Sequence, residues 1–350
     1  MAFSIWSRIR WVLSSSAFVA GLLGDPPEGG PNYYLVGSRV AAKTPKHHGV
    51  VVEVMGDHEK ANVWDWLADS GASVARVFHP DRTQRRRPAT EADYAQIVTK
   101  GDFDRFRALL VSDPDRQVPW SNYLFADDQP WLGKPDTIVA RLKEIGISPV
   151  VSMAYAPNYF PRPLIKNGSQ GQGPQVEDTE VDWGAAASAY EYYFASIFRH
   201  STRSDVVYYT LLNEPPPDLS FVRQVGVLAR LARWALEDVR AQLANASTAS
   251  ALRLSGPALY LSWEEYWPYL SPYVDFLDLH LYEPDGDLLG RKLARAAMRA
   301  REDGRKVVLT EFNRAGGPLP VEQSLFSIKP SLEFAHLLMS IAGGSHPTDA

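Results

Sequence analysis

The chain of 350 residues contains no cysteine. Disulfide bonds, thiol nucleophiles and zinc sites with cysteine ligands are therefore excluded. An excess of positive charge is also missing, because 36 Lys and Arg residues face 41 Asp and Glu residues, for a net charge of -5. Nothing in this balance favours nucleic-acid binding, which depends on clustered Lys and Arg. The one basic run, residues 82–87, has no interleaved aromatic residues and is interpreted as a solvated loop.

Several short motifs that mark enzyme classes are absent as well. No Gly-x-Gly-x-x-Gly turn follows a strand candidate, so no dinucleotide site is predicted. No Gly-x-Ser-x-Gly elbow occurs, which argues against an esterase of the α/β-hydrolase type. His47, His48 and His79 do not form a metal set, because none of the three stands in a His-x-His or Glu-x-x-His spacing. A metal-dependent hydrolase is therefore disfavoured, and neither a metal nor an organic cofactor is predicted.

The sequence also lacks an apolar run long enough to span a bilayer. The most apolar stretch, residues 11–23, is interrupted by three serines and follows the basic residues Arg8 and Arg10. This arrangement predicts a signal peptide over residues 1–24 and an exported protein. The alternative is the mature N-terminus of a cytoplasmic protein. Residues 25–48, rich in Pro and Gly, are predicted to form an irregular lead-in.

From Gly49 onward, runs with strand character alternate with runs of helical periodicity. The strand candidates are residues 49–54, 73–79, 147–154, 206–212, 252–258, 274–282 and 306–312. The helix candidates are residues 62–70, 136–145, 183–200, 221–243, 290–302 and 331–341, and residues 80–135 form a long insertion. Such alternation predicts parallel βαβ units. We expect an α/β fold, a (β/α)8 TIM-type barrel over residues 49–345 that lacks its eighth strand; a doubly wound sheet is the alternative.

Polar side chains follow several of these predicted strands, where a parallel barrel places its chemistry. They are Arg76, His79, Asn213, Glu214, His280, Tyr282 and Glu311. Two carboxylates at strand ends are what glycoside hydrolysis requires, one to protonate the leaving oxygen and one to attack the anomeric carbon. For either glutamate alone, a salt bridge is an equally good interpretation. Tyr155 and Trp263 are candidate sugar platforms near the rim, with packing in the core as the alternative.

Two of these strand ends resemble those of clan A glycoside hydrolases. Residues 212–215 (Leu-Asn-Glu-Pro) and 309–313 (Leu-Thr-Glu-Phe-Asn) are similar to the clan's acid/base and nucleophile strands. The resemblance implies that Glu214 is the acid/base, that Glu311 is the nucleophile and that Asn213 binds the substrate's 2-hydroxyl. It also implies that Tyr282, in a His-x-Tyr motif with His280, and Arg76 support the nucleophile. Residues 255–258 and 149–157 are most similar to glycoside hydrolase family 39, which includes β-xylosidases and α-L-iduronidases.

The resemblance implies a retaining O-glycosidase that takes a glycoside or an oligosaccharide. Two features depart from the pattern: no strand with an aromatic residue follows residues 331–341, and no sequence is left for the β-sandwich of family 39. A carbohydrate-binding pseudoenzyme and a scaffold with relic motifs are the alternatives. We expect the two glutamates to lie about 5–5.5 Å apart, with the pKa of Glu214 raised by Glu311 and by burial. Open sheet edges predict low stability, association and weakened activity.

Overall fold

The computed structural model describes residues 49–52, 74–78, 94–114, 135–153, 163–166, 175–215, 219–257, 263–282 and 286–313. The strands are β1 (Gly49–Val52), β2 (Val74–Phe78), β3 (Ser148–Ser152), β4 (Tyr208–Thr210), β5 (Arg253–Ser255), β6 (Phe276–Tyr282) and β7 (Lys306–Asn313). The helices are α5 (Lys100–Ser112), α7 (Pro135–Glu144), α8 (Trp183–Ser204), α9 (Leu219–Gln242), α10 (Ala246–Ala251), α11 (Trp263–Leu270) and α12 (Gly286–Glu302). The predicted signal peptide, the lead-in and the helix candidates 62–70 and 331–341 lie outside these residues.

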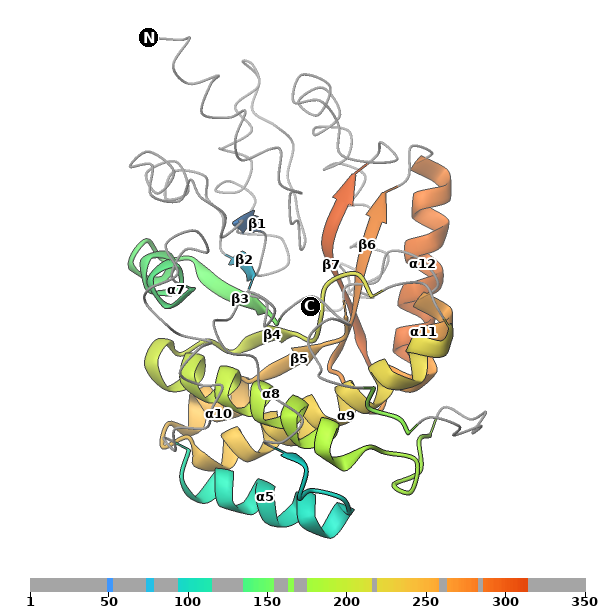
Figure 1. Cartoon of the computed structure of the whole chain (residues 1–350). Helices are drawn as coiled ribbons and strands as arrows, with labels where there is room; N and C mark the ends of the chain where they lie inside the picture. Colours follow the sequence, from blue (N-terminus) through green and yellow to red (C-terminus); the bar gives the residue numbers. More distant parts are fainter. Residues whose placement is uncertain are drawn as a thin grey trace.

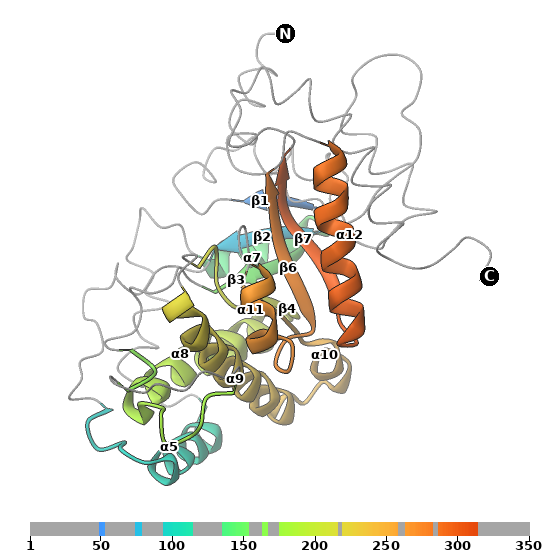
Figure 2. The ribbon, with the colours of Figure 1, turned by 90° about the vertical axis from the view of Figure 1, so that its right-hand side faces the viewer.

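The strands form one parallel sheet whose order, β1 to β7, is the order of the sequence. Helices run along the outside of the sheet, with α8 and α9 below β4 and β5 and α12 beside β6 and β7 (Figures 1 and 2). The predicted α/β architecture with parallel strands is confirmed. Among the described strands, β1 and β7 stand at the two ends of the order, so the closed or incomplete barrel stays a prediction.

The sheet has an apolar outer face and a partly polar inner face. On β4, Tyr209 points outward to α8, where its hydroxyl lies 2.8 Å from the Ser201 hydroxyl. Complete burial raises the pKa of Tyr209 well above its usual value, so its hydroxyl stays protonated. The next residue, Thr210, points to the opposite side, since alternate strand residues face opposite ways, and reaches Asp278 on β6.

The two longest helices, α8 and α9, pack closely against each other, and both contribute many buried apolar side chains to the core. The N-cap residue of α8 is Asp182, whose carboxylate accepts a hydrogen bond from the Ala185 amide. On its other side α9 approaches α11 through Gly226. A methyl group at Gly226 would lie 3.1 Å from the Tyr269 Cβ, so glycine permits this close approach.

Helix α5 lies in the long insertion and packs against α8 and α9 instead of the sheet (Figure 1). A capping box at its start joins Thr99 and Asp102. Its buried Phe103 contacts the rings of Trp183 and Trp234, at centroid distances of 5.1 and 5.8 Å. The insertion therefore adds a helix outside the layer that covers the sheet.

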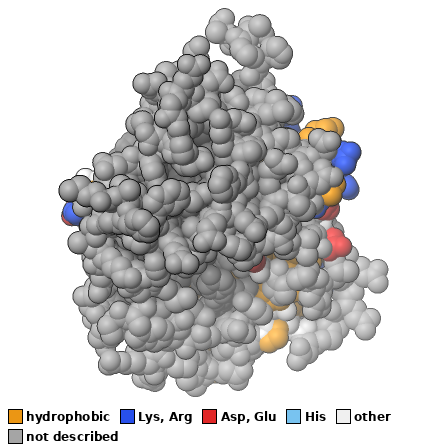
Figure 3. Space-filling model, turned by 90° about the horizontal axis from the view of Figure 1, so that it is seen from above, with side chains coloured by type: hydrophobic (Ala, Val, Ile, Leu, Met, Phe, Trp, Pro, Cys, Tyr) orange, Lys and Arg blue, Asp and Glu red, His pale blue; other side chains and the backbone are white. Residues whose placement is uncertain are grey.

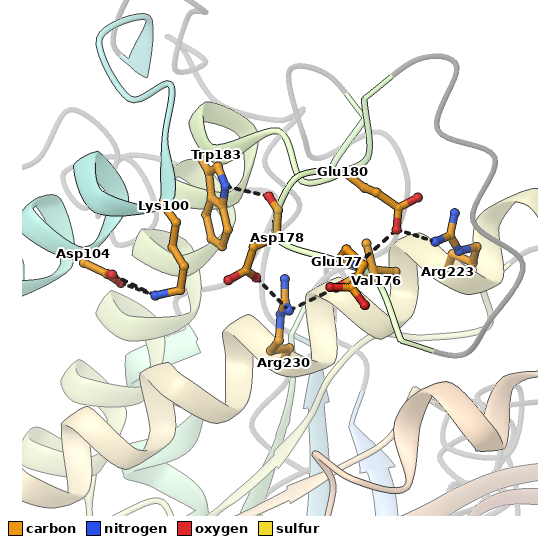
Figure 4. Close-up of polar contacts among 9 residues, drawn as sticks. All are labelled: Lys100, Asp104, Val176, Glu177, Asp178, Glu180, Trp183, Arg223 and Arg230. Atoms are coloured by element: carbon orange, nitrogen blue, oxygen red, sulfur yellow. Dashed lines mark hydrogen bonds and ion pairs between the residues drawn. The ribbon is translucent and has the colours of Figure 1, made fainter.

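Ion pairs fasten the segment before α8 to helix α9 (Figure 4). Arg223 donates to Glu180 at 2.8 Å, and Arg230 donates to Asp178 at 3.2 Å. The Trp183 indole donates to the Asp178 carbonyl at 3.0 Å. The side chains of Arg223 and Glu180 are 14% and 15% exposed, so this pair is worth more than an ordinary surface pair, whereas Asp178 is 45% exposed.

Charges of both signs mix on the described surface. In the view from above, blue, red and orange side chains alternate along one margin of the molecule (Figure 3). Within the described ranges, no helix has the length and apolar character needed to cross a lipid bilayer.

Candidate functional site

A buried arginine forms the centre of the candidate site. Arg76 on β2 is fully buried. Its Nη2 donates to Asn213 Oδ1 at 2.6 Å and to Ser152 Oγ at 3.2 Å, and its Nη1 lies 3.1 Å from His280 Nε2. The side chain therefore joins β2 to β3, to the end of β4 and to β6. Asn213 is 8% exposed, so this part of the network lies just beneath the surface.

The arginine determines which nitrogen of His280 carries the proton. A guanidinium group only donates hydrogen bonds, so His280 Nε2 must accept from Arg76. The proton then lies on Nδ1, which is 2.6 Å from Glu214 Oε1 and donates to it. Arg76, His280 and Glu214 thus form a directed chain in which each group donates to the next.

Glu214 is the point where this buried chain meets solvent. Its side chain is 42% exposed, whereas that of His280 is 0% exposed. Its backbone has φ of 39°, in the left-handed region that residues other than glycine rarely adopt. A strained backbone at a strand end is common at functional sites, where the surrounding structure holds it in place.

The pKa of Glu214 differs from the sequence-based expectation. The hydrogen bond from His280 lowers it below the usual glutamate value, and the positive charge of Arg76 adds to this effect. Burial raises it, but by less. The expectation of a raised pKa is therefore wrong for this state of the site, because strand position alone did not reveal that His280 donates to this carboxylate.

The structure describes only some of the remaining predicted site residues. Glu311 stands opposite His280 in the β6–β7 register, next to a shift in the pairing. The side chains of Glu311 and Tyr282 are outside the described part of the structure, so the separation of the two glutamates stays a prediction. His79 and Tyr155 are also outside it. Trp263, the first residue of α11, is 6% exposed, which favours core packing over a sugar platform.

A second polar layer lies on the inner face of the sheet and was not foreseen from the sequence. The Asp278 carboxylate accepts hydrogen bonds from Ser255 at 3.0 Å and from Thr210 at 3.3 Å. The two hydroxyl oxygens of Ser255 and Thr210 lie 3.1 Å apart. The sequence signal that could have revealed this layer is Asp278, an acidic residue within an apolar strand, two positions before His280.

The donor set of the site does not resemble a metal centre. Among the residues that the structure describes, no group of three or more His, Asp and Glu side chains is close enough to share an ion. The site instead combines one fixed cation, one oriented imidazole and one partly exposed carboxylate. Such a set can bind a polar molecule and move a proton at Glu214 Oε1.

No family model matches the sequence, and no curated protein matches it. Similar solved structures include a fungal β-1,4-galactanase, with 13% identity over 54% of this chain and 59% of that chain, at a TM-score of 0.37. A calcium-binding mutant of β-glucuronidase 2 from Bacteroides uniformis has 12% identity over 82% of this chain and 26% of that chain, at a TM-score of 0.39. An α-L-arabinofuranosidase from Thermotoga maritima has 14% identity over 51% of this chain and 37% of that chain, at a TM-score of 0.28.

These similar structures carry the names of glycosidases, and each match spans less than two thirds of the other chain. Matches with TM-scores this low do not indicate the activity of this chain. Membership of family 39 therefore stays a prediction.

Proposed function

We propose that the chain is a retaining O-glycoside hydrolase in which Glu214 is the acid/base and Glu311 is the nucleophile. The observation that supports this best is the hydrogen-bonded chain from Arg76 through His280 to Glu214, which ends on a partly exposed carboxylate at a strand end. A carboxylate that served only as a surface ion pair would not need a fully buried arginine and histidine behind it. Localisation outside the cell is a further part of this proposal, based on the predicted signal peptide.

The proposed reaction has two displacements. In the first, Glu311 attacks the anomeric carbon, the glycosidic bond breaks, and Glu214 gives its proton to the departing oxygen. In the second, Glu214 takes a proton from water, the water oxygen attacks the anomeric carbon, and the bond to Glu311 breaks. The donor at His280 Nδ1 stabilises the carboxylate form of Glu214, which is the form that the second displacement uses.

Substitution of the two glutamates tests the proposal. Glu311→Gln should abolish hydrolysis of every aryl glycoside in a broad panel, because the attacking carboxylate is lost. Glu214→Gln should keep the first displacement for dinitrophenyl glycosides, whose leaving group needs little protonation, and lose it for poor leaving groups. The measurement is the release of phenol for both kinds of leaving group, with proton NMR of the anomer that forms first.

Glu264→Gln provides the control, since Glu264 lies on α11 in an exposed pair with Arg295 and should keep wild-type rates. Equal losses for good and poor leaving groups in Glu214→Gln would contradict the acid/base role. Sugar binding by calorimetry without hydrolysis in the wild type would favour the pseudoenzyme instead.

A further inference from the structure

Three arginine side chains gather at the edge of the sheet where the strands begin. Arg233 and Arg240 lie two turns apart on one side of α9, and Arg253 is the first residue of β5. Helix α10, which joins α9 to β5, lies at the lower end of β6 and β7, where these strands begin (Figure 2). Glu214 follows the end of β4, and parallel strands begin and end at opposite edges. The arginine cluster is therefore separate from the candidate site.

Two of these arginines converge on one carbonyl oxygen. Arg240 Nη2 and Arg253 Nη1 each donate to the Leu252 carbonyl at 2.7 Å. Arg253 Nη1 also donates to the Ser250 carbonyl at 2.6 Å. Two guanidinium groups that share one acceptor atom lie close together, although their charges repel each other. The geometry thus concentrates positive charge beside the end of α10.

The carboxylates near the cluster do not balance this charge. Asp275, just before β6, pairs with Arg233 at 3.1 Å, and its other oxygen accepts from the Leu254 amide at 2.8 Å. Among the residues that the structure describes, neither Arg240 nor Arg253 forms an ion pair with a carboxylate. Two guanidinium charges are therefore left without an opposite charge in direct contact.

The electrostatic effect of this imbalance falls on Arg240. Burial lowers the pKa of Arg240 below the usual arginine value, and the positive charges of Arg233 and Arg253 lower it further. The carboxylates of Asp275 and Glu237 act in the opposite direction, but the shift remains downward. An arginine keeps its proton all the same. A negative charge added at this place would therefore stabilise the folded chain.

The two side chains also have donors to spare. A guanidinium group has five N–H donors, and within the described residues Arg240 bonds only through Nη2 and Arg253 only through Nη1. Of their nitrogens without a described partner, Arg240 Nε is the one that is buried. Both residues are only partly buried, so a ligand can approach the remaining nitrogens.

We propose that Arg240 and Arg253, supported by the charge of Arg233, form a binding site for a doubly charged oxyanion, a phosphate or sulfate group. Each guanidinium group can offer two parallel N–H donors to two oxygens of such a group. Two guanidinium groups also match its two negative charges, whereas a single carboxylate would leave one of them unmatched. The site is independent of Glu214 and of the proposed hydrolase activity.

Titration of the full chain with sodium sulfate tests the site. The arginines are labelled with 15N, and the Nε–H signals of Arg240 and Arg253 are assigned by their loss in Arg240→Gln and Arg253→Gln. At neutral pH, with sodium chloride keeping the ionic strength constant, both signals should shift and saturate with one Kd of about 1 mM. Each variant should raise the Kd about tenfold, read from the arginine that remains, because it removes charged hydrogen bonds to the anion.

A gain of affinity provides a second variant that does not disturb the cluster. Glu237 is exposed, and its negative charge opposes that of the anion. Glu237→Gln should therefore lower the Kd about threefold. This variant decides if the two arginine variants do not fold. Arg141→Gln and Glu144→Gln, which break an exposed pair on α7, are the matched controls and should leave the Kd unchanged.

Dextran sulfate, with unsulfated dextran as the blank, distinguishes the two sources of the group. A Kd per sulfate group well below that of free sulfate would assign the site to an ester group on a sugar chain, and equal values would assign it to the free ion. Shifts that do not saturate would overturn the inference. So would a Kd that stays the same in folded Arg253→Gln and in Glu237→Gln.

Discussion

Single side chains in the site show what strand position can predict and what it cannot. Arg76, Asn213, Glu214 and His280 were all expected at strand ends, and the structure brings them into one network. The hydrogen bonds among these four side chains were not predictable. The position of a residue at a strand end indicates where its backbone lies, but it does not indicate which neighbouring side chain it bonds. The donor at His280 Nδ1 reverses the expected direction of the Glu214 pKa shift.

This pKa shift predicts how stability depends on pH. The pKa of Glu214 is lower in the folded chain than in the unfolded chain, so its contribution is present above about pH 4.3 and is lost as the pH falls through the folded value. The advantage in Tm of the wild type over Glu214→Gln should therefore shrink between pH 6 and pH 3 in scanning calorimetry. The effect is small, since the side chain is 42% exposed.

Glu214→Asp provides the control for this pH scan, because its shorter carboxylate titrates but cannot reach His280 in the same geometry. Its Tm should depend on pH less than that of the wild type. An advantage of the wild type that grows on acidification would contradict the assigned direction.

At the scale of helices and strands, strongly periodic segments were predicted and weakly periodic ones were missed. All seven strand candidates correspond to strands β1 to β7, although β4 covers only Tyr208–Thr210 of the predicted 206–212. Helix α5 was missed because only Phe103 and Leu110 of its residues are buried, which leaves little apolar periodicity. The Thr99–Asp102 capping box was the sequence signal that could have revealed it. The short helices α10 and α11 were missed too, and the sequence offers each less than three turns to show a period.

A charged cluster outside the sheet should hold α5 in place. Asp238 on α9 accepts from Arg107 at 2.6 and 2.8 Å and from the Tyr190 hydroxyl at 2.5 Å. Burial and the bond to Asp238 raise the pKa of Tyr190, so its hydroxyl remains a donor. Asp238→Asn should lower the free energy of unfolding by about 2 kcal/mol, the usual cost for a charged hydrogen bond in a partly buried place, as measured by urea denaturation.

The same substitution at Asp104 is the control. Asp104 pairs with Lys100 on α5, and the two side chains are 48% and 41% exposed. Asp104→Asn should change the free energy of unfolding by less than about 0.5 kcal/mol. Equal losses for the two variants would show that the buried cluster does not hold the helix.

Two helical glycines should respond oppositely to alanine. Gly226→Ala forces a methyl group to 3.1 Å from Tyr269, so we expect a loss of about 1 kcal/mol despite the better helix propensity of alanine. Gly101→Ala in α5 meets nothing closer than 3.7 Å and should gain about 0.5 kcal/mol. Urea denaturation of both variants measures this, and a gain at Gly226 would mean that α9 and α11 separate easily.

For the whole molecule, the order of the strands was predictable because alternation of strands and helices favours neighbours in sequence. The closure of the sheet was not predictable in the same way, since it depends on what lies between β7 and β1. The described strands place β1 and β7 at the two ends of the order. Exchange of the backbone amides can therefore test whether the sheet is open or closed between β7 and β1.

Hydrogen exchange should separate an open sheet from a closed one. In an open sheet, amides of β1 should exchange faster than those of β3, which pairs with β2 and β4 on both sides. Exchange followed by mass spectrometry at neutral pH, with the fully unfolded chain as reference, measures this difference. Equal protection of β1 and β3 would contradict an open edge and indicate a partner on the far side of β1.

The docking of α5 also has a consequence for how the chain folds while the ribosome is still synthesising it. The residues that fasten this helix, Arg107 and Asp238, are separated by 131 positions in the chain. At ~10 residues per second, roughly 13 seconds of translation pass between their syntheses. Each β–α unit of the sheet can settle on the unit made just before it, whereas Phe103 of α5 has no partner ring until α8 is made, and Arg107 has no Asp238 until α9 is made. During that wait the nascent insertion is a natural target for chaperones and proteases.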